Sequence, residues 1–304
     1  MSSGSRVVSA YVAQTDKDVL PTTGWKVLPS ITNGLNNATT LTDSEMLNGT
    51  RVKTSGIVTS GEITGDLSAE LAYGIYDDFL AAAFWNDWTE GGELTIGDSR
   101  KMFAVTKDFT DAGPNGVYYA FKGVHVNTLS IEITTDGIVN ITFGLMGLGY
   151  ETQKTVSYSA GAAATIVGAK ASGLSVGDIL YEGDPIGVCV EAFSFELDNQ
   201  SEIQKCLGSN MYGGNIHAMI ANASGSMTIA FSEKAYDILE LQRTGGTMSL
   251  EVPIEFEDGT GYTIELPRVQ ISGDIPSPTG NELVTAEVTY MAVDESPILT
   301  RITA

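Results

Sequence analysis

The apolar residues of this chain change their spacing twice, from every second position to every third or fourth. In the stretch GEITGDLSAEL, which begins at Gly61, apolar side chains alternate with polar ones, as in a strand with one face in water. From Tyr76 the period becomes helical, and two acidic residues, Asp77 and Asp78, lie early in this segment, where the helix dipole favours them. The stripe consists of Tyr76, Phe79, Leu80, Ala83 and Phe84. Gly91 and Gly92 then end this unit, so we expect a strand followed by a helix.

A shorter version of the unit returns as GSMTIAFSEKAYDILELQRTGG, from Gly225 to Gly246. Alternation again gives way to a helical stripe, and Ser232 lies where a helix N-cap is expected. Arg243 in the last turn and the Gly-Gly pair after it are typical of a helix end. The sequence therefore predicts a second strand and helix of the same kind.

Alternating segments and turn signals follow both units. Turns are predicted at Asp136-Gly137 after the first unit, and at Asp258-Gly259 and Thr279-Gly280 after the second. The separation between corresponding residues falls steadily along the chain, as a duplication with small deletions in the second copy would produce. We therefore predict a mainly β fold with a short flanking helix, duplicated within the chain. The expected boundaries are a first β domain with an N-terminal arm at 1–150, a linker rich in Ser, Ala and Gly at 151–187, and a second β domain at 188–304.

The charge balance argues against some classes of partner. The chain of 304 residues has 38 acidic residues against 16 Lys and Arg, a formal net charge of −22. Such a surface repels nucleic acid and anionic membranes. The first residues lack the apolar run of a secretory signal, so the sequence predicts synthesis in the cytoplasm.

The sequence lacks the common catalytic motifs, and we expect neither an enzyme nor a cofactor or metal site. His125 and His217 lie in strand-like runs, where a structural role is expected. Asp77-Asp78 fits the solvated start of a helix better than a cation site. Trp85 and Trp88 could stack on a sugar, but their place after the first apolar stripe favours packing.

Three segments carry a resemblance to a known family. They are LPTTGWKVLPSITNGL, SGEITGDLSAELAYGIYDDFLAAAFWNDW and YYAFKGVHVNTLSIEITTDGIVNITFGLMG. The alternating strand up to Leu71, the helix start at Tyr76, the motif F-x-G from Phe121 to Gly123 and the closing hairpin resemble the major tail tube protein of long-tailed, siphovirus-type bacteriophages. The resemblance is clearest from about Trp25 to Gly149.

This resemblance implies packed antiparallel sheets of the tail tube type, sandwich-like or barrel-like, and assembly into rings that stack into a hollow tube. The location would be the tail of a virion, with a tape measure protein and a tail terminator as further partners. Members with one tube domain form rings of six subunits, so two copies in one chain imply a pseudo-sixfold ring of three. DNA would pass through the tube without specific binding, and no membrane contact is implied. We expect the polar strand face with Glu62, Asp66 and Glu70 to line the lumen or to face outside solvent, two alternatives that the sequence leaves open.

The main rival interpretation is a β-sandwich module for carbohydrate binding or adhesion. It shares the strand pattern, and it predicts a monomer with an exposed aromatic platform, for which Trp85 and Trp88 are the candidates.

Overall fold

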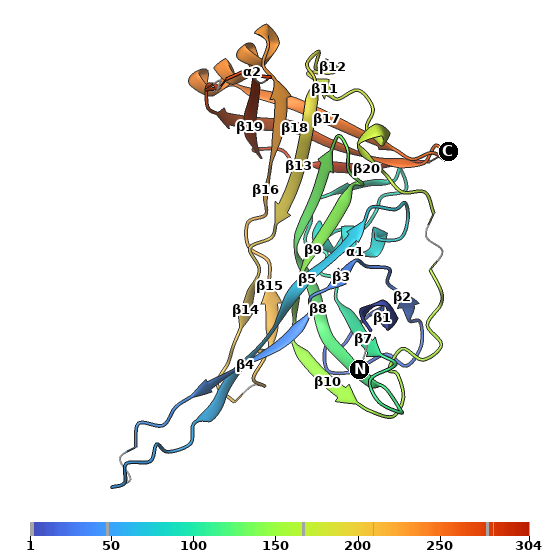
Figure 1. The fold of residues 1–304 in the computed structure, drawn as a ribbon, viewed down its shortest axis with the longest axis vertical. Coiled ribbons are helices and arrows are strands. Elements are labelled where there is room, and N and C mark those ends of the chain that lie inside the picture. Colours follow the sequence, from blue (N-terminus) through green and yellow to red (C-terminus); the bar gives the residue numbers. More distant parts are fainter. Residues whose placement is uncertain are drawn as a thin grey trace.

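The structure, a computed structural model, describes residues 3–46, 49–165, 168–208, 210–277, 280–281 and 283–303. It is mainly β, as the sequence predicts, and its strands pair antiparallel. Figure 1 shows most of the second half (residues 188–304, yellow to red) above the first half (residues 1–150, blue to green), while residues 202–204 and 215–217 lie beside the first half.

The first half forms two sheets that share one long strand, β8, and carries helix α1 (Asp77–Ala83). Strands β7 and β10 flank the first part of β8, and β9 and β13 flank its second part. The strands of this half are β1 (Val7–Ala13), β2 (Lys26–Val27), β3 (Thr32–Asn33), β4 (Asn36–Thr42), β5 (Ile57–Glu70), β6 (Glu93–Thr95), β7 (Phe103–Phe109), β8 (Val117–Thr134), β9 (Asn140–Gly147) and β10 (Gly149–Gln153). A 3-10 helix, η1 (Gly4–Arg6), precedes β1.

The second half adds most of its strands to the large sheet that contains β8, while β14 and β15 form a separate two-stranded sheet, and it carries helix α2 (Glu233–Thr244). Its strands are β11 (Leu180–Tyr181), β12 (Asp184–Pro185), β13 (Val190–Asp198), β14 (Glu202–Gln204), β15 (Asn215–His217), β16 (Asn222–Ala230), β17 (Thr247–Glu255), β18 (Gly261–Gly273), β19 (Thr285–Ala292) and β20 (Ile298–Ile302). The predicted turns at Asp136-Gly137 and Asp258-Gly259 separate β8 from β9 and β17 from β18. The third predicted turn includes Thr279, which lies outside the described residues.

The order of strand pairing is the same in both halves. In the first half, β3 and β4 pair with β5, β5 with β9, β9 with β8, and β8 with β7. In the second half, β13 pairs with β16, β16 with β19, β19 with β18, and β18 with β17. Strand β10 pairs with β8 on the same side as β9, and strand β20 pairs with β18 on the same side as β19.

A local detail recurs with this order. Gly65 in β5 and Gly225 in β16 both lie where a carbonyl group of the neighbouring strand comes very close. A Cβ at Gly65 would lie 2.3 Å from the carbonyl oxygen of Gly34, and one at Gly225 would lie 2.0 Å from that of Ser194. Only glycine fits such an approach. Gly34 and Ser194 therefore occupy corresponding positions, and β3–β4 corresponds to β13.

The predicted helices are present. Phe79, Leu80 and Ala83 of α1 are buried, and α1 packs against β8. In α2 the Ser232 side chain accepts a hydrogen bond from the Ala235 backbone, and Gly245 ends the helix in the left-handed conformation. Both helices contribute to one main hydrophobic core, which includes residues of both halves.

Residues 151–187 run from one half to the other. They begin in β10, which pairs with β8, and isolated bridges then tie Ala163 and Lys170 to the first half. After the 3-10 helix η2 (Gly173–Ser175), β11 pairs with β17 of the second half. The segment predicted as a linker is thus attached to both halves along much of its course.

Strand pairing and side-chain contacts both join the two halves. Strand β13 pairs with β8, and β20 pairs with β6. A polar cluster adds a further contact. Tyr262 donates a hydrogen bond to Asp77 at 2.6 Å, and Arg301 forms an ion pair with the same carboxylate at 2.9 Å. The second half therefore continues the sheet of the first.

Candidate functional site

One polar face of the large sheet crosses both halves without interruption. Directly opposite residues of antiparallel strands point to the same face, so the face can be followed from strand to strand. Asp66 lies opposite Gly144, Gly144 opposite Thr128, and Thr128 opposite Asp198. The same line continues through Asn222 of β16. We call this surface of β5, β9, β8, β13, β16, β19 and β18 the acidic face.

The opposite face of these strands is the core. Ile63 and Leu67 of β5 alternate with the polar residues and are fully buried, as are Leu129 of β8 and Leu197 of β13. A one-residue slip of a strand would bring its polar side chains into this core, so burial fixes which side chains the acidic face presents.

Acidic residues dominate the charges of this face. They are Glu62, Asp66 and Glu70 of β5, Glu132 of β8, Glu196 and Asp198 of β13, and Glu287 of β19. Most of the remaining positions carry Ser, Thr or Asn. Among the described residues, one of these acids has an ion-pair partner, because Lys170 contacts Glu70. The face therefore combines small polar groups with carboxylates, of which Glu70 alone has an ion-pair partner among the described residues.

The three residues singled out from the sequence lie together on this face, as their period of two predicts. Glu62 and Asp66 are exposed, and Glu70 is half-buried beside Lys170. The sequence interpretation missed Glu132, Glu196, Asp198 and Glu287. Each of them lies at a polar position of an alternating strand, which is the signal that could have identified it.

The comparison with protein families agrees with this architecture. The family model described as phage tail tube protein matches residues 4–292. The chain belongs to the phage tail tube protein family. A search of curated proteins found no match. Membership gives the chain a structural role in a virion tail, and it covers both halves of the fold, including the second half, where the sequence resemblance was thin.

The tryptophans do not form an aromatic platform. Trp85 is buried, and the Trp88 indole donates a hydrogen bond to the Asp77 carbonyl while the Arg301 guanidinium lies 3.8 Å from the centre of its ring. Stacking on a sugar would require an open ring face at both residues. The residues that suggested a carbohydrate-binding module are therefore used within the protein.

The two histidines make structural contacts. His125 in β8 is buried, and His217 in β15 lies 3.2 Å from both the Asn215 and the Gln204 side chains. Asp78, which the sequence placed at a helix start, forms an ion pair with Lys26 and accepts a hydrogen bond from Tyr11. Within the described ranges, no group of three or more His, Cys, Asp or Glu side chains could hold a metal ion.

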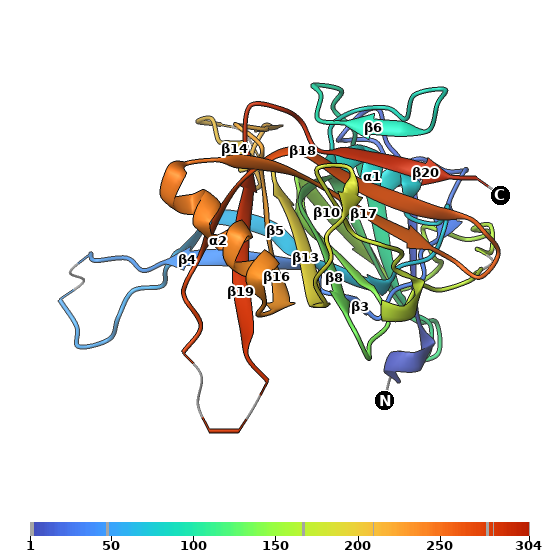
Figure 2. The ribbon, with the colours of Figure 1, turned by 90° about the horizontal axis from the view of Figure 1, so that it is seen from above.

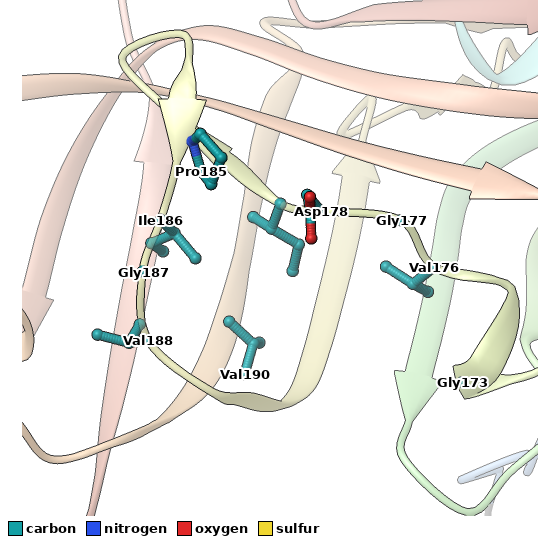
Figure 3. A pocket seen from close by; sticks show the side chains of 10 residues that line it. Gly173, Val176, Gly177, Asp178, Pro185, Ile186, Gly187, Val188 and Val190 are labelled. Atoms are coloured by element: carbon teal, nitrogen blue, oxygen red, sulfur yellow. The ribbon is translucent and has the colours of Figure 1, made fainter.

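A shallow hollow lies between residues 173–188 and the start of β13 (Figure 3). Its lining consists mostly of glycine and apolar side chains, with Asp178 as its one charged residue. Such a lining lacks the converging polar groups by which a small-molecule site orients a ligand. In the part of the chain that the structure describes, no helix is long and apolar enough to cross a membrane.

Proposed function

We propose that this chain polymerises into stacked rings and that the acidic face lines the channel through which DNA passes. The observation that carries the proposal is the continuity of this face across both halves, from β5 to β18, with carboxylates on β5, β8, β13 and β19. A sheet buried on one side and polar on the other can form the wall of a tube with its polar side inward.

An acidic wall suits the passage of a polyanion. Lys and Arg side chains that contact phosphates release counterions and bind DNA tightly, and such contacts would hold the DNA in the tube. Carboxylates that lack cationic partners repel the phosphates, while Ser and Thr keep the wall wetted. The charge distribution therefore favours sliding over binding.

We further propose that the two halves are copies of one tube module and that three chains make one ring. The recurrence of the pairing order and of the Gly65 and Gly225 contacts supports the duplication. Each chain would then fill two of six similar positions around the axis. A tape measure protein inside the tube and a terminator at its end are the partners that such an assembly requires.

Charge reversal on the acidic face tests the channel assignment. We expect Asp66→Lys, Glu132→Lys and Glu196→Lys, combined in one chain, to slow DNA ejection from assembled virions by about tenfold or more, because each ring would then bind phosphates. The control carries Asp136→Lys, Glu257→Lys and Glu295→Lys, which change the net charge equally at exposed sites outside the strands that form the face. Ejection at the same rate from both variants would show that the acidic face does not line the channel.

A further inference from the structure

Strand β13 of the second half pairs with β8 of the first half, and we call this pairing the joint. It shows how one half of the chain pairs with the next. Along β8 and β13, the backbone groups that point at the partner strand belong to every second residue. The Asn199 backbone N–H donates to the Asn127 carbonyl at 3.0 Å, which continues the ladder in which Leu197 lies opposite Leu129. The neighbouring pair, Asp198 and Thr128, lies on the acidic face.

The corresponding edge of the first half has no partner strand among the described residues. Strand β3–β4 corresponds to β13, so Leu35 takes the place of Phe195, which lies opposite Ile131 of β8. The Leu35 backbone N–H instead donates to the Asn33 side chain at 3.2 Å, and its carbonyl accepts a hydrogen bond from Lys107. Side chains thus occupy the backbone groups that would pair with another strand.

The corresponding edge of the second half is closed in the same manner. Ser272 of β18 lies opposite Thr289, just as Thr128 of β8 lies opposite Gly144, so Ser272 corresponds to Thr128. The next residue, Gly273, therefore corresponds to Leu129. The Gln242 side chain donates to the Gly273 carbonyl at 2.8 Å and accepts from the Gly273 N–H at 3.0 Å. One side-chain amide therefore makes both hydrogen bonds that an adjacent strand would make.

The same correspondence explains an exposed apolar residue. Counted two residues past the end of β18 at Gly273, Ile275 matches Ile131, which lies against β13 and is 2% exposed, whereas Ile275 is 83% exposed. Burial of an isoleucine side chain contributes roughly 2 kcal/mol. A strand placed at this edge would cover Ile275 as β13 covers Ile131.

We propose that the β3–β4 edge of a second copy of this chain pairs with the β18 edge and repeats the joint between the halves. Ala38 of one copy lies opposite Ser272 of the other, Asn37 lies opposite Gly273, and Gln242 and Lys107 give up their contacts with the edges. This proposal rests on the ring assembly proposed above and specifies the contact between neighbouring chains in the ring. It also replaces the side-chain contacts that close the two edges with hydrogen bonds between strands.

A disulfide across the joint tests the register. Ala38→Cys and Ser272→Cys are introduced together in a chain that also carries Cys189→Ser and Cys206→Ser, all at exposed positions. Directly opposite residues of antiparallel strands have Cα atoms about 4.5–5.5 Å apart, within the range that a disulfide spans. We expect mild oxidation of assembled tubes to give covalent dimers and trimers, with the series ending at the trimer. The matched control replaces Ser272→Cys with Thr289→Cys, one strand further from the edge and beyond disulfide reach, and we expect monomers.

A second measurement uses Ala38→Cys in the chain that carries Cys189→Ser and Cys206→Ser. Maleimide should label Ala38→Cys readily in the monomer and at least about tenfold more slowly in tubes, because the joint covers the edge. If tubes form but the disulfide does not, or if the thiol introduced at position 38 stays equally reactive in tubes, the proposed joint is wrong. The chain would still have been shown to form tubes. A wild-type chain that forms no rings or tubes would instead contradict the function on which the joint rests.

Discussion

The surroundings of one residue, His125, disfavour its protonated form and so make the protein less stable in acid. Its Nε2 lies 2.7 Å from the Arg100 Nε, and its Nδ1 lies 2.8 Å from the Gly123 carbonyl. Because a guanidinium can only donate, Nε2 must accept and Nδ1 must carry the proton, so the ring is neutral. Burial first, and then the nearby Arg100 charge, lower the pKa of His125 from its usual 6.5 to about 4.

This shift predicts a loss of stability in acid. Between pH 6.5 and pH 4 the unfolded chain binds a proton at His125 that the folded chain does not, so stability falls as the pH falls. The loss from this residue reaches about 3 kcal/mol below pH 4 and is absent above pH 6.5. We expect His125→Gln, which can still accept from Arg100, to flatten the pH dependence of urea unfolding in this window. A wild-type slope in the His125→Gln protein would contradict the assignment.

At the scale of elements, the hairpin of β4 and β5 extends away from the rest of the protein as an arm (Figures 1 and 2). Its far part displays exposed apolar side chains, which are Leu41, Met46, Val52, Ile57 and Val58. The hairpin of β14 and β15 holds the corresponding place in the second half, and its Met211 carbonyl accepts a hydrogen bond from the Gly61 N–H at 3.0 Å. An exposed apolar arm that contributes little to the core is suited to contacts between subunits.

The arm yields a prediction about assembly. We expect Met46→Asp with Val52→Asp to leave the melting temperature of the monomer within about 2 °C of wild type, because both side chains are exposed and outside the core. The same pair should abolish tubes in negative-stain images, because two carboxylates per arm would have to be buried at a contact. Leu174→Asp, at an exposed leucine outside the arm, is the control and should form tubes. Normal tubes from the arm variant would show that the arm does not join subunits.

The sequence predicted what depends on local pattern. The buried face of β5 follows from period two, and the start of α2 follows from Ser232, because both rest on neighbours in the chain. The pairing of β13 with β8 and of β20 with β6 was not predicted, since pattern alone does not choose a distant partner strand. For the same reason three acids of β5 were found and Glu132, Glu196, Asp198 and Glu287 were missed. Their common face exists only once the strands are aligned.

At the scale of the whole molecule, the chain presents two similar modules in one continuous sheet, with a core on one side and carboxylates on the other. Its two closed edges correspond to the two sides of the joint that already exists inside the chain. If each copy repeats that joint, three chains close a ring of six modules, and the acidic face becomes its inner wall.

Electron cryomicroscopy of tubes grown from the purified protein would show which surface forms the inner wall. We predict three chains in each ring, with Asp66, Glu132 and Glu196 around the bore. Tubes whose inner wall is made by another surface, with the acidic face turned to outside solvent, would show that the acidic face does not line the channel.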